Sequence, residues 1–187
     1  MTQMMTRRLG LLAATTLAAA GFLASAPLAS AQANREGANG HGTLLVAGPN
    51  GGEVRRQFSL SAQRRSDGTV RGNAILTNPA FTGFNGRSPY KLQVDIQCMQ
   101  VFGNIAVFGG TTRRTNDPNL VDAVFFSVQD NGEPGAGNDR ISRAFFFDDN
   151  PATQGDPQLC LLNGPNDFPL EPIEAGNIQV RGGVAVP

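Results

Sequence analysis

The sequence predicts a single all-β domain, and three features carry that prediction. Runs in which apolar and polar residues alternate recur along the chain, the clearest being 54–62 and 90–98, and a period of two is that of a half-buried strand. Turn residues such as Asp67-Gly68 separate these runs at short intervals. No segment keeps a helical period for more than a turn or two. Short strands with frequent turns favour a small antiparallel barrel or sandwich.

Of these two architectures we expect the closed barrel, with a β-sandwich as the alternative. Consecutive hairpins form a meander, and closure removes the exposed edges of a sheet. Gly72, Gly109 and Gly110 fall inside expected strands, where glycine permits the sharp bends that a small barrel requires. The domain has about eight strands, expected at 43–47, 54–62, 69–77, 90–98, 105–111, 121–129, 140–147 and 176–181.

Residues 1–31 have the organisation of a signal peptide. A basic start ending in Arg7-Arg8 precedes a long uncharged run, and Ala29-Ser30-Ala31 fits the small-residue cleavage pattern. The run is rich in Ala, Thr and Ser and no stop-transfer segment follows, so we expect no transmembrane segment in the mature chain. The arginine pair also fits a twin-arginine signal, with general secretion as the alternative. We therefore expect a secreted or periplasmic protein.

Beyond the signal peptide, we expect a lead-in, one domain and a tail. Residues 32–41 have no apolar periodicity and should be flexible; the antiparallel β domain spans 42–181, and 182–187 should be loose. No phosphate-binding loop, dinucleotide fingerprint, zinc spacing or heptad pattern is present. All 15 acidic residues lie after residue 31, which leaves the exported part nearly neutral. That balance argues against nucleic acid as a partner.

Cys98 and Cys160 are the only cysteines, and both lie in the part expected to be exported. In an oxidising compartment we expect them to form a disulfide. Closing so long a loop would stabilise the fold by about 4 kcal/mol on the chain-entropy model. The alternative, a nucleophilic cysteine, needs a histidine partner. The sole histidine, His41, lies in a glycine-rich stretch near the mature N-terminus, which weakens that alternative.

The hairpin loop 130–139 is the most conspicuous candidate for a metal site. Two strongly apolar runs close on it from either side. Its spacing departs from that of an EF-hand, and side chains of such loops also cap their own backbone amides. A structural tip is therefore favoured over a calcium site, and we expect no other cofactor. The candidate calcium ligands are Asp130, Asn131, Glu133 and Asp139, with Asn138 as a further oxygen donor.

Carboxylates elsewhere give weaker signals for chemistry. Asp148-Asp149 is a pair of the kind that glycosidases use, but neighbours on a strand point to opposite faces, so a solvated loop is favoured. Asp95 and Asp122 fall inside expected strands, where one of them could face a barrel interior. The alternation of its strand places Asp95 on the wet face.

Arginine pairs and phenylalanines suggest two kinds of ligand. Gathered arginine pairs would bind an anion through bidentate hydrogen bonds, but in a neutral chain ordinary surface charge is favoured. The 12 phenylalanines should lie mainly in the core, and in a lipocalin-sized barrel some would line a cavity for one small apolar ligand. The pairs are Arg55-Arg56, Arg64-Arg65 and Arg113-Arg114.

Several stretches resemble a family of small exported bacterial proteins. The most specific are Asp-Asn-Gly-Glu-Pro-Gly at 130–135 and Gly-Asn-Ile-Gln-Val at 176–180, and the resemblance extends over about 42–181. It implies export and an all-β domain, and it supplies no catalytic residues. The remaining stretches that carry it are 58–62, 67–72, the strand ending at Cys98, 103–106, and the positions Asp139 and Ser142.

Together these observations favour a non-enzymatic exported β-domain that acts as a binding or structural module of the envelope or secreted fraction. The alternatives are a lipocalin-like carrier of a small apolar ligand and a barrel isomerase or cyclase without a recognisable motif. An enclosed apolar cavity would favour the carrier, and a cavity with a buried carboxylate or arginine would favour the enzyme. An interior filled by side chains would leave the structural module.

Overall fold

The computed structural model describes residues 36–48, 51–79, 90–116, 120, 122–146 and 155–182. They belong to one compact unit, Gln32–Pro187, and almost all of their regular structure is antiparallel β, which confirms the predicted class. Among them no helix has the length and apolar character needed to span a bilayer. The strands are β1 Gly37–Ala47, β2 Glu53–Arg64, β3 Val70–Asn78, β4 Tyr90–Phe102, β5 Ile105–Thr115, β6 Ala123–Gln129, β7 Arg140–Ser142, β8 Phe145–Phe146, β9 Leu170–Pro172 and β10 Ala175–Arg181.

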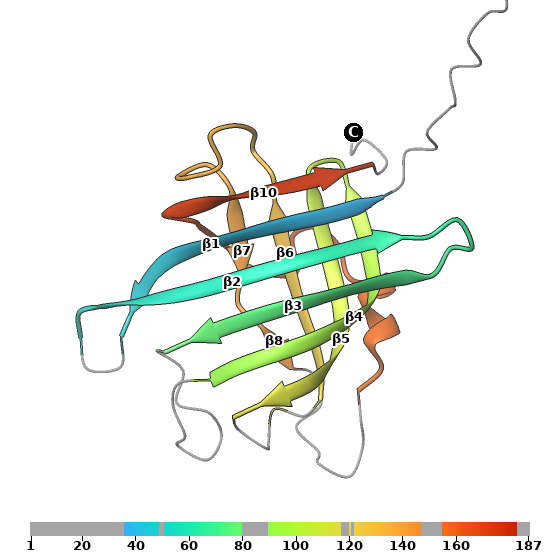
Figure 1. The fold of residues 1–187 in the computed structure, drawn as a ribbon, viewed down its shortest axis with the longest axis horizontal. Coiled ribbons are helices and arrows are strands. Elements are labelled where there is room, and N and C mark those ends of the chain that lie inside the picture. The colour runs from blue at the N-terminus through green and yellow to red at the C-terminus, as the bar shows by residue number, and fades with distance from the viewer. Residues whose placement is uncertain are drawn as a thin grey trace, which may run out of the picture. The chain divides into compact units, whose positions relative to one another are not determined.

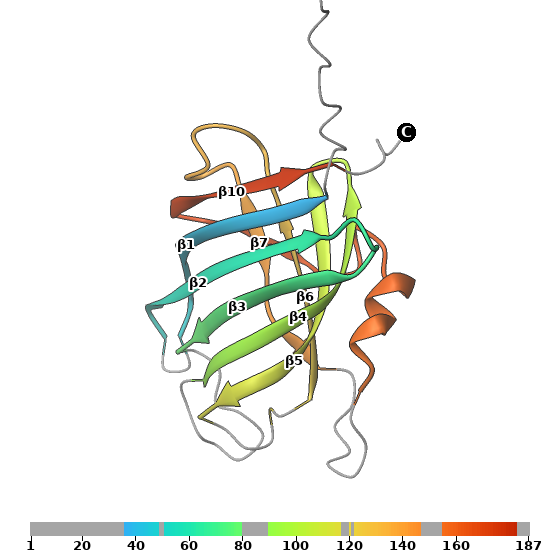
Figure 2. The ribbon, with the colours of Figure 1, turned by 45° about the vertical axis from the view of Figure 1, so that its right-hand side comes forward.

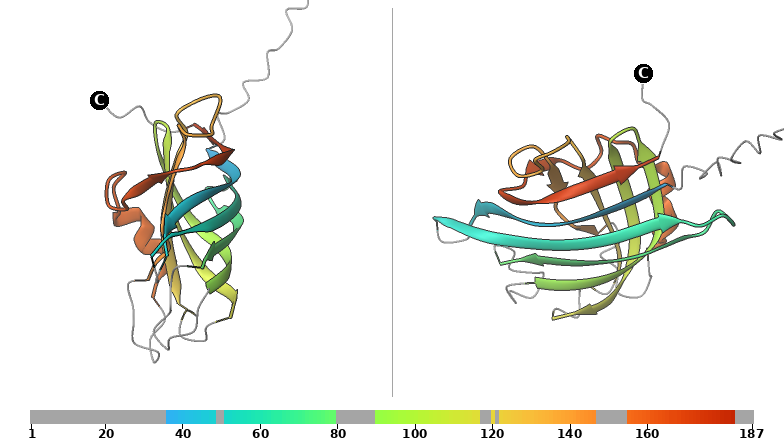
Figure 3. Two further views of the ribbon diagram at one scale, coloured as in Figure 1. Left: turned by 90° about the vertical axis from the view of Figure 1, so that its left-hand side faces the viewer. Right: turned by 45° about the horizontal axis from the view of Figure 1, so that its top comes forward.

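These strands form one sheet that folds over into two layers. The order is β10-β1-β2-β3-β4-β5-β6-β7-β9, with β8 paired to β6. In Figure 1, β10, β1, β2 and β3 cross in front of β6 and β7, and Figure 2 shows β4 and β5 bending from this front layer into the back layer. The layers are seen on edge in the left panel of Figure 3.

The sheet is open, so the predicted closed barrel is wrong and the sandwich alternative fits. The ends of the strand order, β9 and β10, share no ladder within the described residues. Between them the chain passes from the back layer to the front layer at Ile173-Glu174: the Ile173 amide donates to Asp139 O at 2.9 Å, and the Glu174 amide to Thr43 O at 2.7 Å. β10 then pairs with β1 and, within the described residues, is the edge strand of the front layer.

Glycines mark the place where the sheet bends. The ladder between β4 and β5 shifts register between Ile96 and Cys98, as at a β-bulge. A Cβ on Gly110 would lie 2.6 Å from Asp95 O, and one on Gly109 would lie 2.1 Å from Pro157 O. Glycine is therefore needed at both positions, where neighbouring backbone comes too close for any side chain.

One continuous apolar core fills the space between the layers. The inward positions of β2, β3 and β4 alternate with more exposed ones, as predicted, and together with those of β1 they meet the inward positions of β5 and β6. The rings of Phe108 and Phe126 stack with centroids 4.9 Å apart. The largest fully buried members of this core are Phe108, Phe126, Leu44, Leu92, Ile96, Met99, Leu120, Ile141, Ile173 and Ile178.

The outer face of the back layer is covered by a 3-10 helix, η2 (Pro157–Leu162), which lies outside the layers in Figure 3. A second apolar cluster lies here and includes Val107, Phe125 and Phe168. Both faces of β6 are thus buried, so its sequence is apolar at Ala123–Phe126 and Val128, with Ser127 also buried, and does not alternate. The predicted disulfide between Cys98 and Cys160 is present, with Cα atoms 6.1 Å apart, and joins η2 to β4.

The start of β1 differs from the predicted one. The strand begins at Gly37 rather than near Gly42, so residues 37–41 are not part of a flexible lead-in; they pair with β10 on one side and β2 on the other. A Cβ on Gly42 would lie 2.4 Å from Ala175 O and 2.9 Å from the Phe58 ring. The glycines that suggested flexibility therefore permit close packing. Residues 32–35 and 183–187 lie outside the described part.

Two further differences concern short elements. The predicted strand 140–147 is divided into β7, which pairs with β6 and β9, and β8, which pairs with β6 again. β9 was not predicted, because three residues ending in Pro172 carry too little periodicity to be recognised. Within the described residues the sheet therefore has ten strands instead of about eight.

Candidate functional site

The loop 130–139 lies against β10 (Figure 1), and its aspartates bind the edge of that strand. Asp139 is fully buried. Its Oδ2 accepts a hydrogen bond from the Ile178 amide at 2.7 Å, and its Oδ1 accepts one from the Asn131 amide at 2.8 Å. One carboxylate therefore joins the loop to a strand of the front layer.

Asp130 repeats the arrangement two residues further along β10. Its Oδ2 accepts from the Val180 amide at 3.0 Å and its Oδ1 from the Gly132 amide at 2.9 Å. Glu133 Oε1 accepts from Asn177 Nδ2 at 2.7 Å. Asp139 and Asp130 occupy the edge of β10 that is not paired with β1, where their carboxylates replace the carbonyls of a missing neighbour strand. An edge protected in this way is less open to pairing with another chain.

The calcium candidates are brought together in the fold, but Asp130 and Asp139 face backbone amides, while Glu133 and Asn131 accept from the side chains of Asn177 and Asn104. The amide side chains of the loop also bind the loop itself: Asn131 Nδ2 donates to Asn138 O at 2.7 Å, and Asn138 Nδ2 donates to Pro134 O at 2.9 Å. In the described ranges no three His, Cys, Asp or Glu side chains form a group that could hold a metal ion. The geometry is that of a structural loop, and calcium binding stays a prediction to be tested.

Of the other carboxylates considered from the sequence, Asp95 and Asp122 lie in the described part and have different surroundings. Asp95 is on the outer face of β4, about half exposed, with Oδ1 4.0 Å from Arg113 Nη1, as its alternation indicated. Asp122 is buried, and its Oδ1 accepts from the Ala123 and Gly155 amides, both at 2.6 Å. Residues 148–149 lie outside the described part.

The arginine pairs do not gather, and the cysteines are bonded to each other. The three pairs lie at the start of β2, at its end and near the end of β5, and their ion-paired members meet different carboxylates. Since Cys98 and Cys160 form the disulfide, nothing here supports a nucleophilic cysteine. Ion pairs within the described residues include Arg55 with Glu174, Arg56 with Glu171, Arg64 with Glu36, Arg113 with Asp95, and Arg143 with Glu171.

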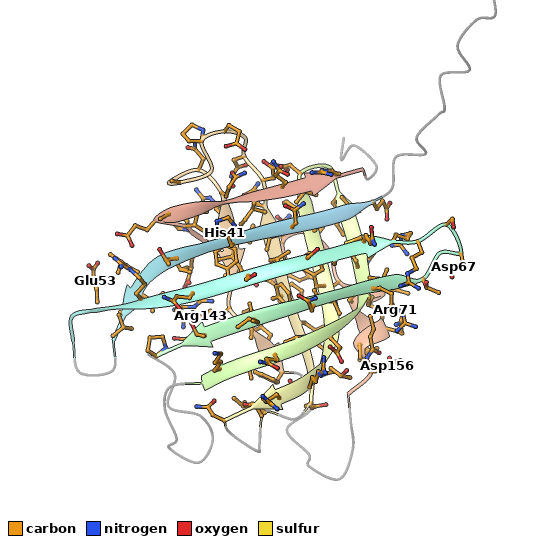
Figure 4. The ribbon with its side chains drawn as sticks, in the orientation of Figure 1. His41, Glu53, Asp67, Arg71, Arg143 and Asp156 are labelled. Carbon is orange, nitrogen blue, oxygen red and sulfur yellow. A yellow bond between two sulfur atoms is a disulfide. The ribbon has the colours of Figure 1, made fainter. Side chains whose placement is uncertain are left out.

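A groove of about 760 Å³ crosses the outer face of the front layer, over β10, β1, β2, β3 and β4. We call it the polar groove. Figure 4 shows the outward side chains of these strands, with Arg71 labelled near the start of β3. Its outward lining includes Asn39, Ser61, Gln63, Arg71, Asn73 and Arg181.

Polar side chains lie in register across this groove. One row consists of Gln179, Asn39, Ser61, Asn73 and Asp95, each directly opposite the next on the neighbouring strand. Strands lie about 4.8 Å apart, so the row presents a polar group at that interval. The side chains of Asn39, Ser61 and Asn73 are exposed and make no hydrogen bond within the described residues.

The fold and the groove together define an open antiparallel β-sandwich domain with a polar outer surface. Comparison of the chain with protein-family models, with curated proteins and with solved structures finds no match.

Sequence reasoning missed the polar groove for two reasons. Asn39 lies in the stretch that was expected to be flexible, so β1 was not recognised as one of its walls. The other lining residues were noted only as the wet side of each strand. The signal that could have revealed it is the repeated polar half of the alternating pattern, but its alignment depends on strand register, which is a property of the folded sheet.

Proposed function

We propose that this chain is an exported, non-enzymatic β-domain that binds a polar ligand in the polar groove. The groove itself is the observation that carries the proposal: it is concave and exposed, and three of its lining side chains, those of Asn39, Ser61 and Asn73, have no hydrogen-bonding partner inside the described fold. A few convergent polar groups in a hollow provide the hydrogen bonds that orient a ligand. The signal-peptide pattern of residues 1–31 and the family resemblance support export.

The two alternatives have less support. A lipocalin-like carrier needs a closed barrel around an apolar cavity, whereas this sheet is open and the inner faces of its layers share one packed core. An isomerase or cyclase needs reactive groups that converge on a substrate. In the polar groove the one lining carboxylate, Asp95, lies beside Arg113, and no second acid or base faces it among the lining residues.

A variant that fills the groove tests the proposal. Ser61→Phe places a ring on the floor of the groove, while Ser59→Phe makes the same change on the same face of β2, outside the lining. Nuclear magnetic resonance spectra would be recorded with a panel of small sugars, amino acids and carboxylic acids. We expect shifts that cluster at Asn39 and Asn73 in the wild type and in Ser59→Phe, and their loss in Ser61→Phe. Shifts that avoid the groove for every compound would refute the proposal.

A further inference from the structure

We propose that the natural ligand of the polar groove is a polysaccharide chain that carries carboxylate groups. This inference rests on the proposed function and specifies the ligand class. Three observations lead to it: the pairing capacity of the polar row, the length over which that row continues, and the charge of the row beside it.

The side chains of the polar row have the donor and acceptor groups needed to form hydrogen bonds with the hydroxyl groups of a sugar. Asn39 and Asn73 each carry a side-chain carbonyl and an NH₂ group, so each one donates and accepts, and Ser61 between them does both through its hydroxyl. A sugar hydroxyl likewise donates and accepts. These three side chains have no hydrogen-bonding partners of their own in the described fold, so no internal bond has to break for a ligand to bind.

The row continues beyond the groove, which indicates an extended ligand. Asp95 on β4 lies opposite Thr111 on β5, so polar groups follow one another from Gln179 on β10 across six strands, a span of about 24 Å. A compact metabolite would occupy only part of that length. An extended polymer lying across the strands would contact all of it.

The neighbouring row supplies positive charge. It consists of Arg181, Gly37, Gln63 and Arg71, again in register. The two guanidinium-bearing residues lie on strands three spacings apart, about 14 Å, and Gly37 leaves the surface between them open. Arg71 has no hydrogen-bonding or ionic partner among the described residues, and a guanidinium binds a carboxylate bidentately.

The negative charges close to the groove already have cations beside them. Asp95 lies beside Arg113, and Glu36 is bonded to Arg64 Nε at 2.7 Å. Among the described residues that line the groove none is aromatic, so these residues offer a sugar ring no flat apolar surface to stack on. Binding therefore depends on hydrogen bonds and on charge, and we expect it to weaken as salt screens the arginines.

Isothermal titration calorimetry with two probes tests the inference: oligogalacturonate, which bears a carboxylate on each sugar, and a dextran oligomer of matched length, which is uncharged. We expect oligogalacturonate to bind, and the double variant Arg71→Gln, Arg181→Gln to weaken its binding by about tenfold or more, since two charge-assisted contacts are lost. Arg140→Gln, an exposed arginine on β7 outside the groove, should leave it unchanged. Ser61→Phe should abolish it.

Other outcomes separate this inference from the proposed function. Equal binding of dextran and oligogalacturonate, unaffected by the arginine changes, would overturn the carboxylate inference and leave a binding groove. Absence of any binding by oligogalacturonate would also overturn it, and the resonance experiment with small compounds would then decide the proposed function. Binding that survives Ser61→Phe would place the carbohydrate elsewhere and contradict the inference. Unchanged thermal unfolding in each variant excludes misfolding as the cause.

Discussion

Asp139 is a buried carboxylate whose two oxygens each accept a backbone amide, Ile178 on β10 and Asn131 in its own loop. We predict that Asp139→Ala lowers the free energy of unfolding by about 3 kcal/mol, because both amides lose a charge-assisted acceptor inside the fold. Urea denaturation followed by circular dichroism measures the change.

The matched control for that substitution is Glu133→Gln in the same loop. Glu133 is exposed, and its bond to Asn177 Nδ2 needs only an oxygen, which glutamine retains. We expect a change within about 0.5 kcal/mol. Equal effects of the two substitutions would show that the loop does not stabilise β10 through Asp139.

The hydrogen bonds of the loop 130–139 predict how calcium should affect the melting temperature. Its two aspartates accept from backbone amides and Glu133 accepts from the Asn177 side chain, so binding a cation would require those bonds to break. We predict that millimolar calcium leaves the melting temperature of the wild-type protein unchanged, as measured by differential scanning calorimetry. A clear increase that chelation reverses would show that the loop is a calcium site after all.

Asp67 offers a pH-dependent test at the β2–β3 turn. The Thr69 hydroxyl and then the Thr69 amide, at 2.6 and 2.9 Å, hold the pKa of Asp67 below its usual 3.8. A carboxyl group whose pKa is lowered in the folded state stabilises the fold at pH values above its usual pKa. This stabilisation is lost as the pH falls through the lowered pKa. We predict that Thr69→Val raises the pKa of Asp67 towards 3.8, as followed by carboxyl ¹³C resonances. An unchanged titration would mean that the hydroxyl is not the cause.

At the scale of the element, β1 depends on the absence of side chains at its glycines. Gly40 and Gly42 lie where β10 and Phe58 come close, and a Cβ on either would contact backbone atoms of β10 at 2.9 Å or less. A glycine-rich stretch therefore forms the strand between β10 and β2, although its composition suggested flexibility.

We predict that Gly42→Ala lowers the free energy of unfolding by about 2 kcal/mol, because the new methyl group overpacks against Ala175 O and the Phe58 ring. His41→Ala is the control, since the side chain of His41 is exposed on the outer face of β1 (Figure 4). Chemical denaturation of both variants measures the difference. If Gly42→Ala is as stable as the wild type, residues 37–43 are not packed as a strand.

At the scale of the whole molecule, a buried arginine joins the two layers. Arg56 lies on the inward face of β2, where an apolar residue was expected from the alternation, and is 5% exposed. It pairs with Glu171 on β9, and its Nη2 donates to Ser142 O at 3.0 Å. A charge inside the fold is tolerated because it meets an opposite charge and a carbonyl.

We predict that Arg56→Ala lowers the free energy of unfolding by about 3 kcal/mol, because the contacts between β2 and the back layer are lost. Arg55→Ala is a control on the same strand: Arg55 is exposed and paired with Glu174 at 3.3 Å, a surface ion pair worth less than about 1 kcal/mol. Equilibrium denaturation of both variants measures the contrast. Similar losses would mean that Arg56 does not hold the layers together.

The sequence by itself determined the strands and their local connections. The alternation in 54–62 and 90–98 identified β2 and most of β4, the turn at Asp67-Gly68 identified a hairpin, and two cysteines allowed one disulfide. The alternation and the turn depend on residues close together in the chain, and two cysteines can form only one disulfide within the chain. A period of two is visible wherever one face of a strand is wet, so no tertiary information was needed.

Only the tertiary structure decided whether the sheet closes, where β1 begins and what the acidic loop binds. Closure depends on whether β9 and β10 pair, and the residues between them instead carry the chain from one layer to the other. The role of Gly42 depends on how closely Ala175 and Phe58 approach it. The partner of Asp139 is an amide on β10, 39 positions away in the sequence. Each of these outcomes depends on neighbours that are distant in the sequence, which a local residue pattern does not encode. The strand register that aligns the side chains of the polar groove depends on such neighbours in the same way.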